Sequence, residues 1–279
     1  MKYVIVMDSC GERTAAMKQD ERIIPAPLTM QVDEYAIVDD DTFDQADFLK
    51  KIADSPNCPK SACPSPDYYK EAYAKSEERA YAVTLSAELS GSYNSAMLAK
   101  ELILEERPEM KIHVFNSRSA SVGETLITHK IQECEKAGME FEELVNAVEA
   151  YIDSQNTTFF LENLETLRKN GRLSNLKAFF ASALKIKPVL AATPEGTIIQ
   201  LDQARGVNKA LVKMVSYVVT GVENPEEKVL AISHCNCPER CEMVKNAILE
   251  KIQVKEVITV DTAGISSMYA NDGGIIVVI

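Results

Sequence analysis

Short apolar runs alternate with amphipathic stretches along the first half of the chain. Three runs predict buried strands: Tyr3–Met7, Tyr81–Leu85 and Lys111–Ser117. Three stretches have apolar residues at helical spacing: Thr42–Ala53, Asn94–Arg107 and Phe141–Ile152. Strands that alternate with helices are typical of a parallel sheet with helices on both faces. The first half is therefore predicted to be an α/β domain of this kind.

Two of these helices carry boundary signals. Thr42 and Gln45 stand three residues apart, the spacing of a capping box, which predicts that the first helix opens there. Pro108 cannot continue a helix, so the second helix is predicted to end before it.

The alternation restarts after about residue 158. A helix is predicted to begin at Phe159 and to end at a left-handed cap at Asn170–Gly171, followed by a helix over 176–184. Strands are predicted on both sides of a Glu195–Gly196 turn, at 228–234, at 256–262 and at the end of the chain, with a helix over 239–252. We therefore expect two domains, residues 1–158 and residues 159–279, the second an α/β domain with a mixed sheet.

Composition narrows the class of protein. The chain has 279 residues, 46% of them hydrophobic, which is enough for a substantial core. Its 42 acidic and 30 basic residues give a net charge of −12, which disfavours nucleic acid or an anionic membrane surface as partner. The first apolar run stops at Asp8, too short for a signal peptide or a membrane span, so a cytoplasmic protein is expected. Seven cysteines, an odd number in a long chain, predict reduced thiols.

Serine-rich segments follow the predicted strands. In an open α/β sheet, ligands bind beyond the carboxyl ends of the strands. Four such junctions occur: Asp8-Ser9-Cys10, Ser61 with Ser65, Ser86 with Ser90 and Ser92, and Ser117 with Ser119 and Ser121. Serine is also a preferred helix N-cap, which is the alternative explanation for any single junction. Together they predict a crevice lined with hydroxyls, which donate to a carboxylate or phosphate without adding charge.

Other chemistries have weaker signals. A serine hydrolase stays open, although no serine lies in G-x-S-x-G and the histidines at 113, 129 and 234 are not spaced to pair with one. His234, Cys235, Cys237 and Cys241 form an unusual C-x-C group that fits a strand end and an apolar helix face better than a zinc site. The acidic run at 39–47 lacks the glycine and glutamate of a calcium loop, and no nucleotide-binding loop is present, so no cofactor is expected.

Several segments, in order, resemble the DegV family of fatty-acid-binding proteins. LSAELSGSYNSA (85–96) is similar to the family signature L-S-S-x-L-S-G-T-Y-x-S-A. MDSCGE, KSACPSP and NSRSASVGE resemble its D-S-S, T-S-Q-P-S and D-S-x-x-x-S-x-G motifs, with Asn116 in place of the usual aspartate. LENLETLRKNGRLS resembles L-x-x-L-x-x-G-G-R-I-S, with Asn170 in place of the first glycine. The resemblance spans nearly the whole chain.

The resemblance implies a two-domain protein that holds a long-chain fatty acid between its domains and has no cofactor of its own. By position, Ser61 and Ser90 look like the donors to the carboxylate, with Ser9, Ser92 and Asn94 in support. Bacterial members present the bound acid to a separate fatty acid kinase, which makes an acyl phosphate. Arg172 looks like the family arginine that lies beside the head group and contacts this kinase. From the residues alone, Arg172 could equally be a surface arginine near a helix end.

One departure from the family pattern bears on the head group. The terminal motif reads roughly G-x-H-x-G-P-G, whereas here Tyr269 occupies the histidine position, followed by Asn271 and Asp272 in place of small neutral residues. A tyrosine hydroxyl can donate to a carboxylate, so Tyr269 joins the predicted carboxylate site, but it carries no positive charge near neutral pH.

The acyl tail is expected to dominate affinity, because roughly a dozen buried methylenes contribute on the order of 10 kcal/mol before ordering costs. The apolar residues Phe179, Phe180, Leu184 and Ile186 are candidates to line its channel, or belong to an ordinary core. Two other functions remain open: a serine hydrolase or small-acid transferase that uses the same crevice, and a binding module for a non-lipid ligand.

Overall fold

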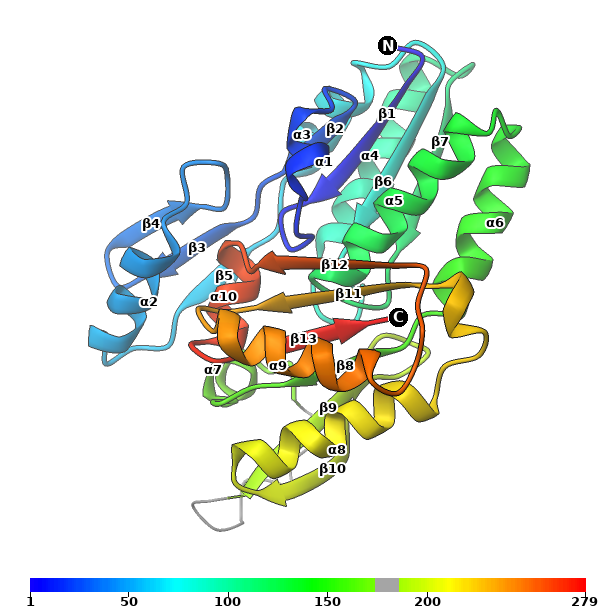
Figure 1. Cartoon of the computed structure of the whole chain (residues 1–279). Helices are drawn as coiled ribbons and strands as arrows, with labels where there is room; N and C mark the ends of the chain where they lie inside the picture. The colour runs from blue at the N-terminus through cyan, green and yellow to red at the C-terminus, as the bar shows by residue number, and fades with distance from the viewer. Residues whose placement is uncertain (174–185) are drawn as a thin grey trace.

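The computed structural model describes residues 1–173 and 186–279. Its first lobe is built on a four-stranded parallel sheet in the order β2-β1-β6-β7 (Figure 1). The strands are β1 (Tyr3–Asp8), β2 (Ile23–Ala26), β6 (Arg79–Thr84) and β7 (Lys111–Asn116). Its helices are α1 (Ala15–Gln19), α3 (Pro66–Tyr73), α4 (Ser92–Glu106), α5 (Val122–Lys136) and α6 (Phe141–Asp153).

Side chains alternate between the two faces of this sheet. On β1, Ile5 and Met7 pack under α5 and α6, whereas Val4 and Val6 pack under α3 and α4. Both sets are almost completely buried, because helices cover the sheet on each side. The predicted parallel sheet with helices on both faces is confirmed.

A small antiparallel sheet, which the sequence pattern did not indicate, extends from the first lobe. It has the order β4-β3-β5, with β3 at Thr29–Val32, β4 at Tyr35–Val38 and β5 at Lys60–Ala62. With α2 (Gln45–Asp54) it projects to the left of the parallel sheet in Figure 1. Ser61 lies in β5, so its predicted place at the end of a core parallel strand is wrong. Ser65 instead caps α3 through the Tyr68 N–H.

The predicted capping box of α2 is also wrong. Asp44 is the N-cap, and its carboxylate accepts the Asp47 N–H at 3.0 Å. Thr42 lies two residues earlier and donates its hydroxyl to Asp40 at 2.6 Å. Both residue types can cap a helix, and here the acidic turn before the helix holds Thr42 outside it.

The second lobe is built on a six-stranded mixed sheet in the order β10-β9-β8-β13-β11-β12. The strands are β8 (Thr157–Phe160), β9 (Ile186–Ala192), β10 (Ile198–Arg205), β11 (Val229–His234), β12 (Glu256–Asp261) and β13 (Ile275–Val278). Its described helices are α7 (Glu165–Lys169), α8 (Val207–Thr220), α9 (Pro238–Leu249) and α10 (Gly264–Ala270). Only β11 and β12 pair in parallel, so the predicted mixed sheet is confirmed.

The two lobes pack against each other through α5. Helices α8 and α9 cover one face of the six-stranded sheet, while Val122 and Leu126 of α5 pack against Val229, Ala231 and Val278 on the other face (Figure 1). All five of these side chains are buried. The sheet of the second lobe is therefore covered on one side by the first lobe.

The helix predicted from Phe159 to the cap at Asn170–Gly171 is shorter than expected. Residues up to Phe160 form β8, whose four side chains are all buried, and the helix α7 covers only Glu165–Lys169. Gly171 does adopt the predicted left-handed conformation, with φ of 78°. The predicted boundary between residues 158 and 159 falls inside β8, and the division into two domains there stays a prediction. The helix predicted over 176–184 lies outside the described residues.

Within the described ranges, none of the helices is both long enough and apolar enough to cross a membrane.

Candidate functional site

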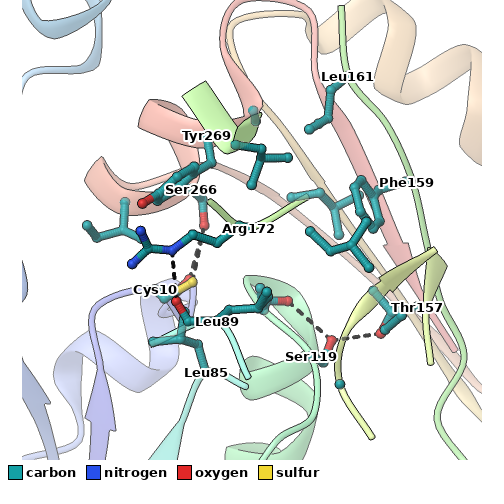
Figure 2. A pocket seen from close by; sticks show the side chains of 18 of the residues that line it. Cys10, Leu85, Leu89, Ser119, Thr157, Phe159, Leu161, Arg172, Ser266 and Tyr269 are labelled. Carbon is teal, nitrogen blue, oxygen red and sulfur yellow. Dashed lines mark hydrogen bonds between the residues drawn. The ribbon is translucent and has the colours of Figure 1, made fainter. Parts of the chain in front are cut away.

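An apolar cavity of about 100 Å³ lies where the two lobes meet (Figure 2). The first lobe contributes Cys10, Leu85, Leu89 and Ala120, among others. The second lobe contributes Phe159, Leu161, Leu167, Ile198, Ile265 and Ile276. Because β1 and β6 end at this edge of the parallel sheet, the residues that follow them reach the cavity.

Arg172 and Tyr269 line one end of the cavity, its polar end, and Ser61 lies beside Tyr269 there. The hydroxyls of Ser61 and Tyr269 lie 3.2 Å apart, although the two residues come from different lobes. The guanidinium carbon of Arg172 lies 6.0 Å from the centre of the Tyr269 ring, within the range of a cation–π contact. Figure 2 shows Arg172 and Tyr269 on the same side of the cavity. Two hydroxyl donors and a cation thus converge at this end.

Backbone contacts hold Arg172 in place. Its Nε donates to the carbonyl of Leu89 at 3.0 Å and its Nη1 donates to the carbonyl of Asn170 at 2.6 Å. The Asn170 side chain donates in turn to the carbonyl of Pro59, just before β5. The arginine is therefore tied to the segments that carry Ser61 and Ser90, and it is not a free surface side chain.

Ser90 and Ser92 form one small network at the start of α4. Ser90 accepts the Ser92 N–H at 3.2 Å and donates its hydroxyl to that of Ser92 at 3.3 Å. Ser90 is half-buried, Ser92 is fully buried, and the neighbouring Leu89 lines the cavity. The structure places Ser90 next to the polar end without a contact to Ser61 or Tyr269 in the described residues.

Two other predicted residues lie elsewhere. Ser9 accepts the Leu28 N–H at 2.9 Å and lines a separate, polar cavity of about 240 Å³ together with Glu12, Arg13 and Asp39. Asn94 is exposed in the first turn of α4. Their supporting roles in the head-group site are not visible in the geometry.

Three other serines of the predicted junctions join the lobes. Ser86 donates to the carbonyl of Gly196 at 2.7 Å, and the Ser119 hydroxyl lies 2.7 Å from that of Thr157. Ser119 and Thr157 line the cavity at the end away from Tyr269 (Figure 2). Ser121 makes a similar contact of 2.7 Å with Ser233 of β11. These hydroxyls are satisfied by protein partners and fix the position of one lobe on the other.

Sequence reasoning missed a group of buried acids beside the cavity. Asp8 accepts the N–H groups of Cys10 and Leu85, and Glu12 accepts the Ala263 N–H and the Ser121 hydroxyl. Burial raises the pKa of Asp8 to about 6 and that of Glu12 to about 8, and it raises the pKa of Glu124 well above its usual value. Asp8 is buried by Leu85, 77 positions later, and Glu12 by Ala263 of the second lobe, so no local pattern in the sequence signals their burial.

The histidines do not activate a serine in the described structure. His113 lies 2.9 Å from Glu149, His129 lies 4.0 Å from Glu133, and His234 lies 3.0 Å from Asp261. The geometry therefore offers no Ser–His pair within the described ranges.

The structure also shows the surroundings of Cys241 and Asp272 and of one candidate channel residue. Cys241 packs with Val244 and Ile248 in an apolar cluster, which confirms the helix-face interpretation of that cysteine. Asp272, which replaces a small neutral residue of the resembled motif, accepts a hydrogen bond from Asn236 at 2.9 Å. Of the candidate channel residues, Ile186 begins β9, and Phe179, Phe180 and Leu184 lie outside the described residues.

Comparisons with known proteins point to one family. A sequence model described as an uncharacterised protein of the DegV family matches residues 2–279. A DegV domain-containing protein of Streptococcus gordonii is 33% identical over 99% of this chain and 98% of the relative.

Solved structures agree with this match. A DegV family protein of Ruminococcus gnavus, described with vaccenic acid, is 56% identical with a TM-score of 0.97, and the match covers 100% of this chain and 99% of that one. The fatty acid kinase B3 protein of Streptococcus pneumoniae, loaded with linoleic acid, is 32% identical with a TM-score of 0.88, again over 100% and 99% of the two chains.

Proposed function

This chain belongs to the DegV family, and we propose that it binds one long-chain fatty acid in the cavity between its lobes and presents the carboxylate to a partner fatty acid kinase. The similar proteins of Ruminococcus gnavus and Streptococcus pneumoniae are described with vaccenic and linoleic acid. Only the second of these is described as a protein of a fatty acid kinase.

The observation that carries the proposal is the polarity of the cavity. Its walls are mainly leucine, isoleucine and phenylalanine side chains, with Tyr269 and Arg172 at one end. The hydroxyl of Ser61, which is not itself part of the cavity wall, lies 3.2 Å from that of Tyr269. This distribution matches a ligand with one anionic head and a long apolar tail. The hydroxyls would donate to the carboxylate, and Arg172 would add positive charge near it.

Tail burial and head-group contacts have different roles in this proposal. Each methylene transferred from water contributes about 0.8 kcal/mol, so the tail supplies most of the affinity. Each head-group hydrogen bond to a charged ligand contributes about 1.5–3 kcal/mol and fixes which end of the acid faces Tyr269. The carboxylate is then held at the mouth, where a partner can reach it.

No residue of this chain is proposed to catalyse a reaction. The kinase would transfer the terminal phosphoryl group of ATP to a carboxylate oxygen, which yields an acyl phosphate and ADP. This chain would hold the acid, orient its carboxylate, and contact the kinase through the surface around Arg172.

Calorimetric titration of the delipidated protein with saturated fatty acids of increasing length tests the binding proposal. We expect one acid per chain and an affinity that rises with each added methylene, up to the capacity of the cavity. Ser61→Ala should weaken binding about tenfold, because it removes a head-group donor. Ser65→Ala, which removes only the cap of α3, is the matched control and should leave affinity unchanged.

A coupled assay tests presentation. With ATP and a fatty acid kinase, acyl phosphate should form only when this chain supplies the acid, and Arg172→Ala should slow formation more than it weakens binding. Release of acid from an ester by this chain alone, or covalent labelling of Ser90 by a fluorophosphonate, would instead support a hydrolase.

A further inference from the structure

Helix α10 belongs to the second lobe in the sequence but is anchored by the first. It lies between β12 and β13, and its first N–H groups point to Asp39, the residue after β4. One carboxylate oxygen of Asp39 accepts the Gly264 N–H at 2.7 Å, and the other accepts the Ile265 N–H at 2.9 Å. Asp39 is only 2% exposed, and its own N–H donates to the carbonyl of Leu28.

The contact is close-fitting. A side chain at Gly264 would place its first carbon 2.6 Å from the Asp39 carboxylate and 2.4 Å from the end of Met30. Only glycine allows α10 to approach Asp39 this closely. Ile265 and Met268 of the helix then pack with Met30 and Phe48 of the first lobe.

Additional bonds reinforce the same end of α10. Gln45 of α2 donates to the carbonyl of Thr262 at 2.8 Å, and Ser266 donates to the carbonyl of Cys10 at 3.1 Å. Glu12 accepts the Ala263 N–H at 2.7 Å. Residues 262–266 are thus held from several sides by the first lobe.

The opposite end of α10 carries Tyr269, the proposed donor to the carboxylate. Tyr269 lies five residues after Gly264, which is about 8 Å along a helix. The hydroxyl contact of 3.2 Å to Ser61 therefore depends on where the first turn of α10 is fixed. Asp39 lines the separate polar cavity and not the apolar one, so any effect it has on a ligand in the apolar cavity is indirect. The hydrogen bonds of its carboxylate run to the first turn of α10.

We propose that Asp39 is a positioning residue for the head-group site: it anchors α10 across the lobe interface and so places the Tyr269 hydroxyl against the carboxylate of the ligand. The proposal rests on the proposed function for its ligand. It adds a determinant of head-group binding that lies outside the cavity.

Double-mutant binding measurements test this role, with palmitate and 1-hexadecanol as probes of equal chain length. Asp39→Ala should weaken palmitate binding about tenfold and hexadecanol binding much less, because only palmitate has a carboxylate. In a Tyr269→Phe background, Asp39→Ala should cause little further loss, because both changes remove the same contact. Additive losses, or equal losses for the two probes, would overturn the proposal.

Two further variants guard against misfolding of Asp39→Ala and against effects of charge removal alone. Asp39→Asn retains one acceptor oxygen and nearly the same volume, so it should fold and give a smaller loss in the same direction. Asp40→Asn is the matched control, because the neighbouring carboxylate is exposed and bonds only within its own acidic turn in the described structure. It should bind palmitate like the unmodified chain.

A readout without ligand separates this inference from the proposed function. Amide hydrogen exchange at Gly264 and Ile265 should be faster in Asp39→Ala than in Asp40→Asn, because both N–H groups lose their acceptor. Unchanged exchange would contradict the anchor itself. If the unmodified chain bound neither probe, the proposed function would fail while the exchange measurement still decided whether Asp39 fixes α10.

Discussion

Tyr269 stands where the terminal motif that this chain resembles has histidine. Its hydroxyl faces Ser61 and its ring lies near the Arg172 guanidinium, so a neutral donor occupies a position where the family motif has histidine. A neutral donor binds a carboxylate with little dependence on pH near neutrality, whereas an imidazole gains charge below a pH of about 6.5.

Tyr269→His should therefore make fatty-acid binding depend on pH. We expect affinity for palmitate to rise several-fold as the pH falls from about 7.5 to about 5.5, because the imidazolium attracts the carboxylate. Titration of both proteins across this range measures the effect, with hexadecanol as the uncharged control. Parallel pH profiles for the two proteins would contradict a head-group role for Tyr269.

Glu12 predicts a pH dependence of stability. Its pKa is raised from 4.5 to about 8 by burial, so between these values the folded protein holds a proton that the unfolded chain has released. The free energy of unfolding should fall as pH rises through this window, by at most about 1.4 kcal/mol per pH unit from this group. The raised pKa of Asp8, about 6, adds to the slope in the lower part of the window.

Glu12→Gln should flatten this slope, because an amide resembles the protonated carboxyl and does not titrate. Urea unfolding at several pH values between about 5 and 8 measures the difference. Glu21→Gln, on the exposed turn before β2, is the control and should keep the original slope. An unchanged slope in Glu12→Gln would mean that Glu12 is ionised in the folded protein.

At the scale of single residues, those that belong to a sequence motif were predictable, whereas those buried by contacts between distant segments were not. Ser61, Arg172 and Tyr269 were predicted through family resemblance, and the structure places them close together. Asp39 belongs to the acidic run at 39–47, which carries no sequence signal of a ligand site. Its burial comes from contact with α10, more than 200 residues later in the chain, which no local pattern can indicate.

At the scale of single elements, strands and helices with a strong period were predictable, whereas weakly patterned ones were not. The stripe of α6 buries Phe141, Leu144, Val148 and Ile152 as expected. Phe159 and Phe160, the second half of β8, were predicted to begin a helix. All four residues of β8 are buried, so the strand shows no alternation of apolar and polar residues.

The N-cap of α2 gives a test at this scale. Asp44→Ala should lower the free energy of unfolding by about 1 kcal/mol, because the Asp47 N–H loses its acceptor. Thr42→Ala should cost less, since Thr42 lies outside the helix. Chemical denaturation of both variants measures the two effects. A larger loss for Thr42→Ala would restore the capping box that the sequence suggested.

Strand β8 offers a matched pair of variants for the cavity. Phe159 lines the cavity, whereas its neighbour Phe160 points into the core under α8 and α9. Each change to alanine should destabilise the protein by about 3–5 kcal/mol. Only Phe159→Ala should also shift the bound acids toward longer or bulkier chains, as measured by mass spectrometry of co-purified lipid. A similar shift in Phe160→Ala would argue that the effect is indirect.

At the scale of the whole molecule, the function proposed here depends on how two sheets meet. Helix α5 packs on both, serine pairs such as Ser121 with Ser233 join them, and the cavity occupies part of the space between. The fold class followed from the alternation of strands and helices. The interface did not, because contacts such as Ser86 with Gly196 and Ser121 with Ser233 join residues that are more than 100 positions apart.

The proposed function depends most on whether a fatty acid fills this cavity. Mass spectrometry of the purified, denatured protein tests this directly, when combined with stoichiometry from the intact complex. We predict one long-chain fatty acid per chain, displaced by added palmitate and held less tightly by Ser61→Ala. A protein that carries no acid and does not take up palmitate after delipidation would contradict the central claim.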